Sequence, residues 1–92
     1  MFYFVYILMS ERDGNFYIGI TKNIEQRLAD HNAGKNKSTN FRRPFKLIFY
    51  EAYLSKSDAL RRELYFKTTK GKVTIKQMLR EYLDSLPTNP FH

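Results

Sequence analysis

Apolar residues gather in three stretches of the chain that predict β-strands. Residues 2–9, FYFVYILM, are almost wholly apolar and rich in aromatic and β-branched side chains, which favours a strand buried on both faces. The dipeptide Asp13-Gly14 favours a hairpin turn, and residues 16–20 then return as an antiparallel strand. Residues 45–54, FKLIFYEAYL, predict a third strand. We expect a small antiparallel sheet with the first strand at its centre.

A helix is predicted directly after the second strand. Asn23 is a favourable N-cap, and Gln26 stands three residues later, where its side chain can reach back to the cap. The helical pattern ends near Gly34. Residues 35–44, KNKSTNFRRP, are polar, basic and aperiodic, and they predict a loop.

Two further helices are predicted after the third strand. Ser55 and Asp58 form an S-x-x-D capping pattern for the first of them. Gly71 interrupts the helical pattern, and Thr74 with Gln77 forms another capping pattern beyond it. Apolar residues at strict helical spacing follow and predict one last helix that serves packing.

The order strand, strand, helix, strand, helix, helix predicts an α+β fold, in which a small three-stranded antiparallel sheet is flanked by about three helices. Residues 1–86 are expected to form a single domain, because no linker or internal repeat divides them. Residues 87–92 contain two prolines and predict a polar C-terminal tail.

The first predicted helix has polar residues on the side where a core requires apolar ones. Counted from Ile24 in steps of three and four, its inward positions include Arg27 and His31. Each residue can be explained without a function. The long Arg27 side chain can reach solvent, and His31 can be a half-buried histidine with satisfied hydrogen bonds. Considered singly, both residues favour that structural explanation.

Glu63 occupies a similar position on the second predicted helix, because it falls within the apolar arc. The other members of that arc are Ala59, Leu60, Leu64 and Phe66. An inward-leaning carboxylate costs desolvation free energy unless a cation compensates it. Lys67, four residues later, can form an ion pair worth about 0.3–0.5 kcal/mol on a surface. A bound divalent cation would compensate the carboxylate more fully.

The chain carries a net charge of +7, from 16 Lys and Arg against nine acidic residues, and the positive charge is concentrated in two segments. Neither segment contains an acid, so both attract polyanions. A solvated basic surface explains the charge equally well. Seven Tyr and eight Phe favour nucleic acid, since exposed rings beside cations stack on bases. The candidate nucleic-acid-binding residues are Lys35, Lys37, Arg42, Arg43, Lys46, Lys67, Lys70, Lys72 and Lys76.

Composition also excludes several classes of protein. The chain has 92 residues and no cysteine, which excludes disulfides, thiolate metal ligands and a cysteine nucleophile. No apolar run approaches the roughly 18 residues of a membrane span. The apolar N-terminus is followed at once by charged residues and lacks a small-residue cleavage site. We expect a soluble, cytoplasmic protein with no membrane partner.

Five residues form an unusual chemical set: Tyr6 and Tyr17 in the strands, Arg27 and His31 in the first helix, and Glu63 in the second. Such a set can hydrolyse a phosphodiester. A metal on the carboxylate would stabilise leaving-group charge, the guanidinium would hold the phosphate, and a phenol or imidazole would take a proton from water. A phenol, with a pKa near about 10, needs a neighbouring cation to act as a base at neutral pH. Composition and spacing leave this chemistry as one interpretation among several.

The order and spacing of these residues resemble the GIY-YIG endonuclease domain over nearly the whole chain. VYI at residues 5–7, YIG at 17–19, Arg27 and His31 in the following helix, and the glutamate of ALRRE at 59–63 are the matching motifs. YIG is a weak signal by itself, but the ordered set is specific. The chain is most similar to the small stand-alone bacterial members of that family.

The resemblance implies hydrolysis of one DNA strand with a single divalent metal, Mg²⁺ or Mn²⁺. Tyr6 and Tyr17 would line the pocket, and one of them would assist deprotonation of the attacking water. Arg27 would hold the phosphate, and His31 would assist proton transfer or orientation. Glu63 would ligate the metal.

Two positions depart from the family pattern. Val5 replaces the first glycine of GIY, which a central strand tolerates. Many members also carry an asparagine downstream of the glutamate, where this chain offers Gln77, and the predicted capping role of Gln77 already accounts for that residue.

Three functions therefore remain open at the level of sequence. The first is a metal-dependent DNA endonuclease acting on flapped, nicked or branched forms. The second is a non-catalytic nucleic-acid-binding module that retains the pocket, and the third is an interaction domain for a repair protein. A chain of this size covers only a short length of duplex, which leaves room for a homodimer or a repair-protein partner.

Overall fold

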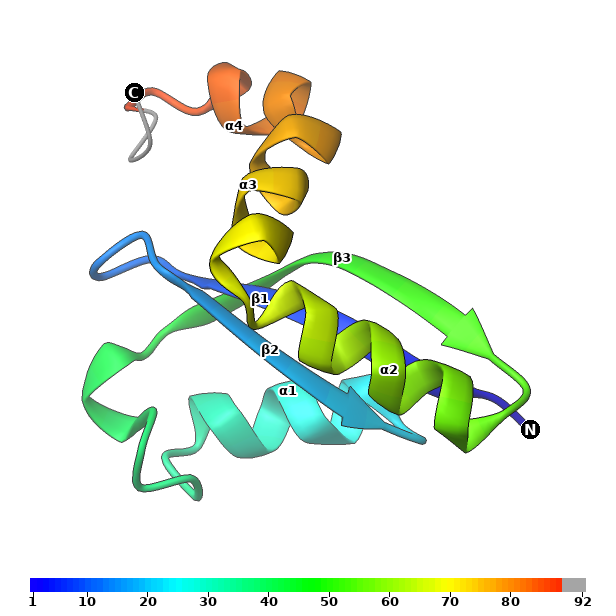
Figure 1. Cartoon of the computed structure of the whole chain (residues 1–92). Coiled ribbons are helices and arrows are strands. Elements are labelled where there is room, and N and C mark those ends of the chain that lie inside the picture. Colours follow the sequence, from blue (N-terminus) through cyan, green and yellow to red (C-terminus); the bar gives the residue numbers. More distant parts are fainter. Residues whose placement is uncertain (89–92) are drawn as a thin grey trace.

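The computed structural model describes residues 1–88 and has the predicted α+β architecture (Figure 1). Residues 1–88 form one three-stranded sheet, four α-helices and a short 3₁₀ helix, η1, which lies in the predicted loop. In chain order the elements are β1 Tyr3–Ser10, β2 Phe16–Thr21, α1 Ile24–Asn32, η1 Asn40–Arg42, β3 Phe45–Tyr53, α2 Lys56–Phe66, α3 Thr69–Met78 and α4 Arg80–Ser85.

The sheet is antiparallel with the order β2-β1-β3, so the first strand is central, as predicted. Its residues from Val5 onward are buried, because helices cover both of its faces. Tyr6 lies opposite Gly19 of β2 and Tyr50 of β3. The pairing with β3 shifts between Ile7 and Leu8. β2 is therefore an edge strand, and its Gly19 is the neighbour of Tyr6.

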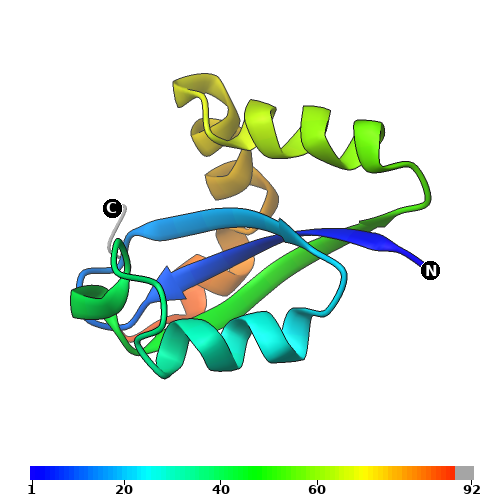
Figure 2. The same cartoon turned by 90° about the horizontal axis from the view of Figure 1, so that it is seen from below.

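The two faces of the sheet carry separate cores. Val5 and Ile7 belong to a cluster with residues of α2 and α3, whereas Tyr6 and Leu8 belong to a cluster that Leu28 of α1 joins. Figure 2 shows α1 and α2 on opposite sides of the sheet. Alternate residues of β1 therefore face different helices. Tyr6 faces α1, the helix that carries Arg27 and His31.

The first helix begins as the sequence predicts. The Asn23 side chain accepts a hydrogen bond from the backbone N–H of Gln26 at 3.1 Å, which satisfies one of the free donors of the first turn. The Gln26 side chain, however, donates to Asp30 at 2.9 Å instead of reaching back to the cap. Ser55 precedes α2 but makes no capping hydrogen bond with its side chain. The predicted capping pattern of Ser55 is therefore wrong, although the helix begins there.

The C-terminal helices begin and end at residues that the sequence did not predict. Thr68 caps α3 by accepting from the backbone N–H of Gly71 at 2.9 Å, so Gly71 lies within the first turn of the helix. Thr74 lies inside α3 and its hydroxyl donates to the Lys70 carbonyl at 3.1 Å. The predicted cap of Thr74 with Gln77 is therefore wrong. The helix ends at Met78, and a separate helix, α4, follows.

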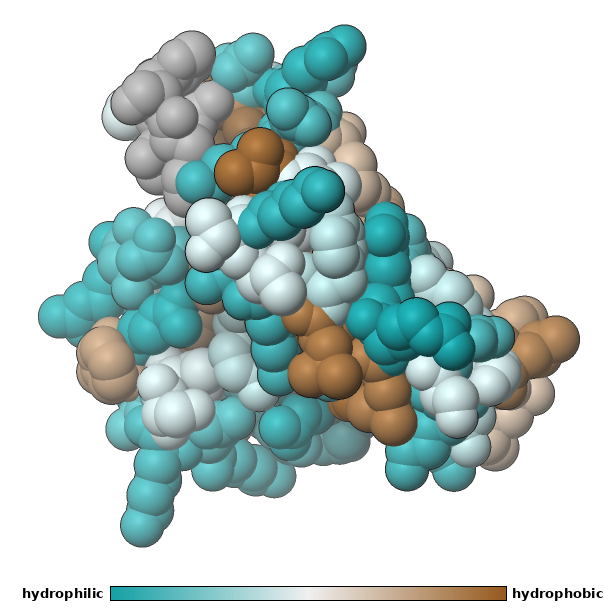
Figure 3. All heavy atoms as spheres, viewed as in Figure 1, coloured by the Kyte–Doolittle hydropathy of each residue, from teal (hydrophilic) through white to brown (hydrophobic). Residues whose placement is uncertain are grey.

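The apolar arc predicted for α2 is only half correct. Ala59 and Phe66 are buried against the sheet, but Leu60 is partly exposed and Leu64 is 63% exposed. On the face drawn in Figure 3, apolar residues gather along α2 within a largely hydrophilic surface. α2 therefore uses a narrow stripe for packing, and Glu63 lies beside that stripe.

Most of the predicted tail 87–92 lies outside the described residues, which end at Thr88. Within residues 1–88, no helix has both the length and the apolar character that crossing a membrane requires.

Candidate active site

Tyr6 lies at the centre of the candidate site and is 1% exposed. Its ring lies over Gly19, and a Cβ atom at that position would collide with the Tyr6 hydroxyl. Gly19 thus provides the space through which the phenol reaches the edge strand β2. The group that approaches Gly19 closely is therefore the side chain of Tyr6.

The two polar residues on the inner face of α1 both contact the Tyr6 hydroxyl. Arg27 donates from Nε to the Tyr6 hydroxyl oxygen at 3.4 Å. The His31 Nε2 atom lies 3.4 Å from the same oxygen. Because Arg27 can only donate, the Tyr6 oxygen accepts from it and the Tyr6 proton is free to point to His31. His31 is fully buried, which is deeper than the sequence indicated.

Thr39, in the loop after α1, holds the other side of the His31 ring. Its Oγ1 atom lies 3.0 Å from His31 Nδ1, and its hydroxyl donates to the Asn36 carbonyl at 3.4 Å. When the Thr39 proton points to Asn36, its oxygen accepts from Nδ1–H, and Nε2 is left as an acceptor for the Tyr6 proton. The hydrogen bonds then run in one direction, from Arg27 through Tyr6 to His31.

Tyr17 completes the cluster from β2. Its ring centroid lies 4.6 Å from that of His31 in an edge arrangement and 6.3 Å from that of Tyr6. The hydrogen bond to Tyr6 holds the pKa of the Arg27 guanidinium above its usual range, and the Tyr17 hydroxyl contributes to this to a smaller extent. The structure thus brings together four of the five predicted residues.

The charges around Tyr6 oppose one another. Burial raises the pKa of the Tyr6 phenol, the hydrogen bond from Arg27 lowers it, and the nearby Tyr17 and Glu63 raise it further. The net pKa lies above the usual value, so Tyr6 is protonated at neutral pH. Glu63 has the weakest of these influences, and it belongs to α2, on the other face of the sheet.

The titration of His31 should make the fold sensitive to mild acid. Burial and the nearby Arg27 hold the pKa of His31 below its usual value, with Asp30 opposing them. The unfolded chain, with a histidine pKa near about 6.5, binds the proton more readily, so stability is full above that pH and falls as the pH drops below it. We expect a lower Tm at pH 5.5 than at pH 7.5, measured by circular dichroism. Replacing His31→Gln should reduce this difference, and an equal difference in both proteins would contradict the assignment.

Glu63 is the candidate metal ligand. Its side chain is only 12% exposed and pairs with Lys67 at 3.3 Å, as the sequence suggested. Within residues 1–88 no group of three or more His, Cys, Asp or Glu residues gathers around a common point. A single carboxylate fits Mg²⁺ or Mn²⁺, since Mg²⁺ keeps several waters and takes further ligands from substrate phosphates, whereas zinc sites need three or four protein ligands. Lys67 is half-exposed, so its ammonium can move aside when a cation binds.

The predicted nucleic-acid-binding residues lie in two separate regions. Lys35, Lys37 and Arg43 lie around the loop that follows α1, whereas Lys70 and Lys72 lie on exposed positions of α3. Several of the predicted cations also have partners within the fold. Lys35 pairs with Asp30, Arg42 pairs with Asp13, Lys67 pairs with Glu63, Lys46 lies over the Tyr82 ring, and Lys76 is half-buried with a partner.

Two residues have positions that the sequence does not reveal. Thr39 is one threonine in a polar loop, and nothing marks it as the residue that orients His31. Gln77, which was compared with the family asparagine, lies exposed near the end of α3 and contributes no cap. The positions of both residues depend on how distant segments pack, which a single sequence does not reveal.

Comparison with known proteins identifies relatives along nearly the whole chain. The family described as GIY-YIG catalytic domain matches residues 2–77. A UPF0213 protein of Staphylococcus haemolyticus is 43% identical over 77 residues, which are 83% of this chain and 93% of the relative. A UPF0213 protein of Bacillus licheniformis is 41% identical over 90 residues, which are 94% of this chain and 93% of the relative. The solution NMR structure of a UPF0213 protein from Bacillus halodurans is similar with a TM-score of 0.54 at 34% identity, covering 85% of each chain.

Proposed function

Because the chain belongs to the GIY-YIG family, a family of nucleases, we propose that it is an endonuclease that hydrolyses DNA phosphodiester bonds with a divalent metal, Mg²⁺ or Mn²⁺. One observation carries the proposal: Tyr6, Tyr17, Arg27 and His31 form one contiguous cluster. The substrates we propose are flapped, nicked or branched DNA of the kind that repair and recombination produce.

The direction of the hydrogen bonds suggests how the attacking water would be deprotonated. The proton of the water passes to the Tyr6 oxygen while the Tyr6 proton passes to His31 Nε2, so no phenolate accumulates. This coupling matters because burial raises the pKa of Tyr6, which makes the isolated phenolate unfavourable. The hydroxide attacks phosphorus, and the bond from phosphorus to the leaving oxygen breaks. Arg27 and the Tyr17 hydroxyl lie beside Tyr6, where they can hold the phosphate oxygens.

A divalent cation held by Glu63 would supply stabilisation of the charge on the leaving oxygen. The roles of the chain's own residues follow from their positions. Glu63 brings a negative charge to an otherwise cationic site, and the basic residues around it attract the DNA backbone. Lys67, when released from Glu63, lies near enough to that carboxylate to contact a phosphate held beside it.

A panel of DNA structures tests the function. Single strand, blunt duplex, nicked duplex, flap and four-way junction are each incubated with the wild-type protein in Mg²⁺, in Mn²⁺ and in EDTA, and binding is measured on the same samples. The proposal requires cleavage of at least one structure with metal and none in EDTA. Binding that weakens steeply with salt, without cleavage of any structure, would instead assign the chain to the non-catalytic nucleic-acid-binding module.

A Tyr6→Phe variant should fold and cleave slowly. It keeps the ring over Gly19 but removes the oxygen that accepts the proton of the water, a role worth about 10²- to 10⁴-fold in rate. Single-turnover cleavage in Mg²⁺ measures the loss. Tyr53→Phe is the matched control, because the Tyr53 hydroxyl donates to Glu51 away from the cluster. A Tyr6→Phe variant that cleaves at the wild-type rate would exclude Tyr6 as the proton acceptor.

The same proposal places the protein in the cytoplasm, where its DNA substrate lies. It also includes a targeting partner, either a second copy of the chain or a repair protein, since one chain of 92 residues covers a short length of duplex. Size-exclusion chromatography with light scattering, with and without DNA, distinguishes a monomer from a dimer. A monomer on DNA would leave a repair protein as the proposed partner.

A further inference from the structure

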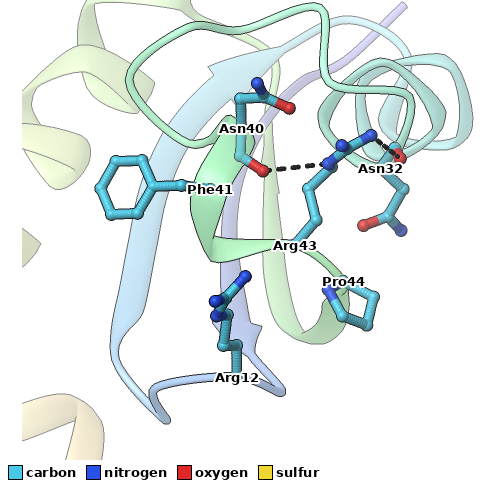
Figure 4. A pocket seen from close by; sticks show the side chains of 6 residues that line it. All are labelled: Arg12, Asn32, Asn40, Phe41, Arg43 and Pro44. Carbon is cyan, nitrogen blue, oxygen red and sulfur yellow. Dashed lines mark hydrogen bonds between the residues drawn. The ribbon is translucent and has the colours of Figure 1, made fainter.

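A shallow pocket lies beside η1, on the loop that follows α1, and none of the site chemistry above uses it. Its volume is about 390 Å³. Figure 4 shows the Phe41 ring projecting away from the loop, with the side chain of Arg12 below it and that of Arg43 between the loop and Asn32. The lining residues are Arg12, Asn32, Asn40, Phe41, Arg43 and Pro44.

Phe41 is the unusual member of this group, because its side chain is 68% exposed on a strongly hydrophilic segment. Leaving so large an apolar ring in water forgoes the stabilisation that burial of a phenylalanine contributes. An exposed aromatic ring flanked by cations is the arrangement that proteins use to stack a nucleobase. Packing within the fold therefore does not explain the exposure of the Phe41 ring, whereas stacking on a nucleobase does.

The loop that carries Phe41 is held firmly by contacts with distant segments. Ser10 donates from its hydroxyl to the Arg42 carbonyl at 2.6 Å. The Arg42 guanidinium pairs with Asp13 at 3.0 Å and donates to the Phe16 carbonyl at 3.2 Å. A ring on a fixed loop loses little conformational entropy when a ligand stacks on it.

The two arginines of the pocket present positive charge that no acid in the described part of the chain neutralises. Arg43 donates only to backbone carbonyls, of Asn40 at 2.9 Å and of Asn32 at 3.4 Å, so its guanidinium is fixed in position but keeps its charge. Arg12 forms no ion pair with residues 1–88. Each of these guanidinium groups can give an anion in the pocket a charge-assisted contact.

The pocket adjoins the candidate active site through two residues of the chain. Thr39, which contacts His31, immediately precedes η1, and Phe41 lies within η1. A nucleic acid strand whose phosphate lies at Arg27 would have to extend past the Thr39 loop to enter the pocket. Duplex bases are already stacked on one another, so only an unpaired base can stack on Phe41.

We propose that Phe41, Arg12 and Arg43 form a subsite for an unpaired nucleotide of the DNA substrate, with the base on the Phe41 ring and its phosphate between the arginines. This inference rests on the proposed function, because it assigns the structure of the substrate of the same site. A phenyl ring offers no hydrogen bonds, so the subsite accepts any base. The protein would then select DNA with a single-stranded segment beside the scissile bond, such as a flap.

Binding without metal tests the subsite separately from cleavage. A dye-labelled oligothymidylate of twelve nucleotides and a blunt duplex of twelve base pairs are titrated with the full chain in EDTA, and fluorescence anisotropy gives Kd. Phe41→Ala should raise Kd for the single strand about tenfold, since one stacked base contributes strongly, and should change Kd for the duplex less than about twofold. Phe41→Trp should restore the wild-type value, which a merely structural role of Phe41 would not predict.

Phe2→Ala is the matched control, because Phe2 is a half-exposed ring at the N-terminus, at the other end of β1 from the loop. It should leave both Kd values unchanged. Phe41-dependent binding in a protein that cleaves no DNA would support the subsite and overturn the nuclease proposal. Equal single-strand Kd values for the wild-type protein and Phe41→Ala would overturn the subsite, whether or not the protein cleaves.

Discussion

A Glu63→Gln variant should fold normally and lose metal-dependent cleavage down to background. Glutamine keeps the size of the side chain but removes the charge that would hold the cation, and the loss of several kcal/mol of transition-state stabilisation corresponds to about 10³-fold or more in rate. The ion pair with the half-exposed Lys67 is worth only about 0.3–0.5 kcal/mol, so the thermal midpoint should change little. Cleavage is measured under single-turnover conditions in Mg²⁺.

The control for this variant is Glu81→Gln, which makes the same charge change on α4 at an exposed residue. It should cleave at the wild-type rate. Binding of DNA by Glu63→Gln should be preserved, because the basic residues and Phe41 are untouched. A Glu63→Gln protein that cleaves as fast as the Glu81→Gln control would exclude Glu63 as the metal ligand.

A Gly71→Ala variant should be strongly destabilised. A Cβ atom on Gly71 would collide with the Tyr65 carbonyl and would lie 2.7 Å from the Phe66 Cα atom, and both are backbone atoms that cannot turn aside. Relieving the collision requires α3 to move away from the end of α2, which we expect to cost about 3 kcal/mol of unfolding free energy. Urea denaturation followed by circular dichroism measures the change.

Lys72→Ala is the matched control in the same helix. Lys72 is exposed, and alanine is at least as good a helix former as lysine, so its unfolding free energy should stay within about 0.5 kcal/mol of the wild-type value. A Gly71→Ala protein as stable as Lys72→Ala would show that α2 and α3 do not approach as closely as described.

The strands could be predicted from the sequence because the residue patterns that mark them are local. The apolar run of the first strand and the Asp13-Gly14 turn predicted a central strand with an antiparallel neighbour, and the structure confirms both. Gly71 was misinterpreted because a glycine that breaks a helix and a glycine that lets two helices touch look alike in a sequence. The exposure of Leu64 was missed for a related reason, since its neighbours in space come from distant parts of the chain.

The candidate site could be predicted from the sequence only for those of its residues that lie on regular helices and strands. Arg27 and His31 share a helix face, and the resemblance to the GIY-YIG domain joined them to Tyr6; the structure brings these three into contact. Thr39 and Phe41 could not be predicted, because the loop that carries them is positioned by contacts such as the one from Ser10 to the Arg42 carbonyl, 32 residues apart. A loop of polar residues carries no periodicity that could reveal such a contact.

The central claim is that this site hydrolyses DNA with a metal held by Glu63. Its most direct test is a titration of Mg²⁺ from EDTA to saturation, in which single-turnover cleavage of a flap substrate is followed for the wild-type protein and for Glu63→Gln. The wild-type rate should rise from zero to a plateau, while the rate of the variant should stay at background at every Mg²⁺ concentration. Cleavage in EDTA, or equal rates for the two proteins, would contradict it.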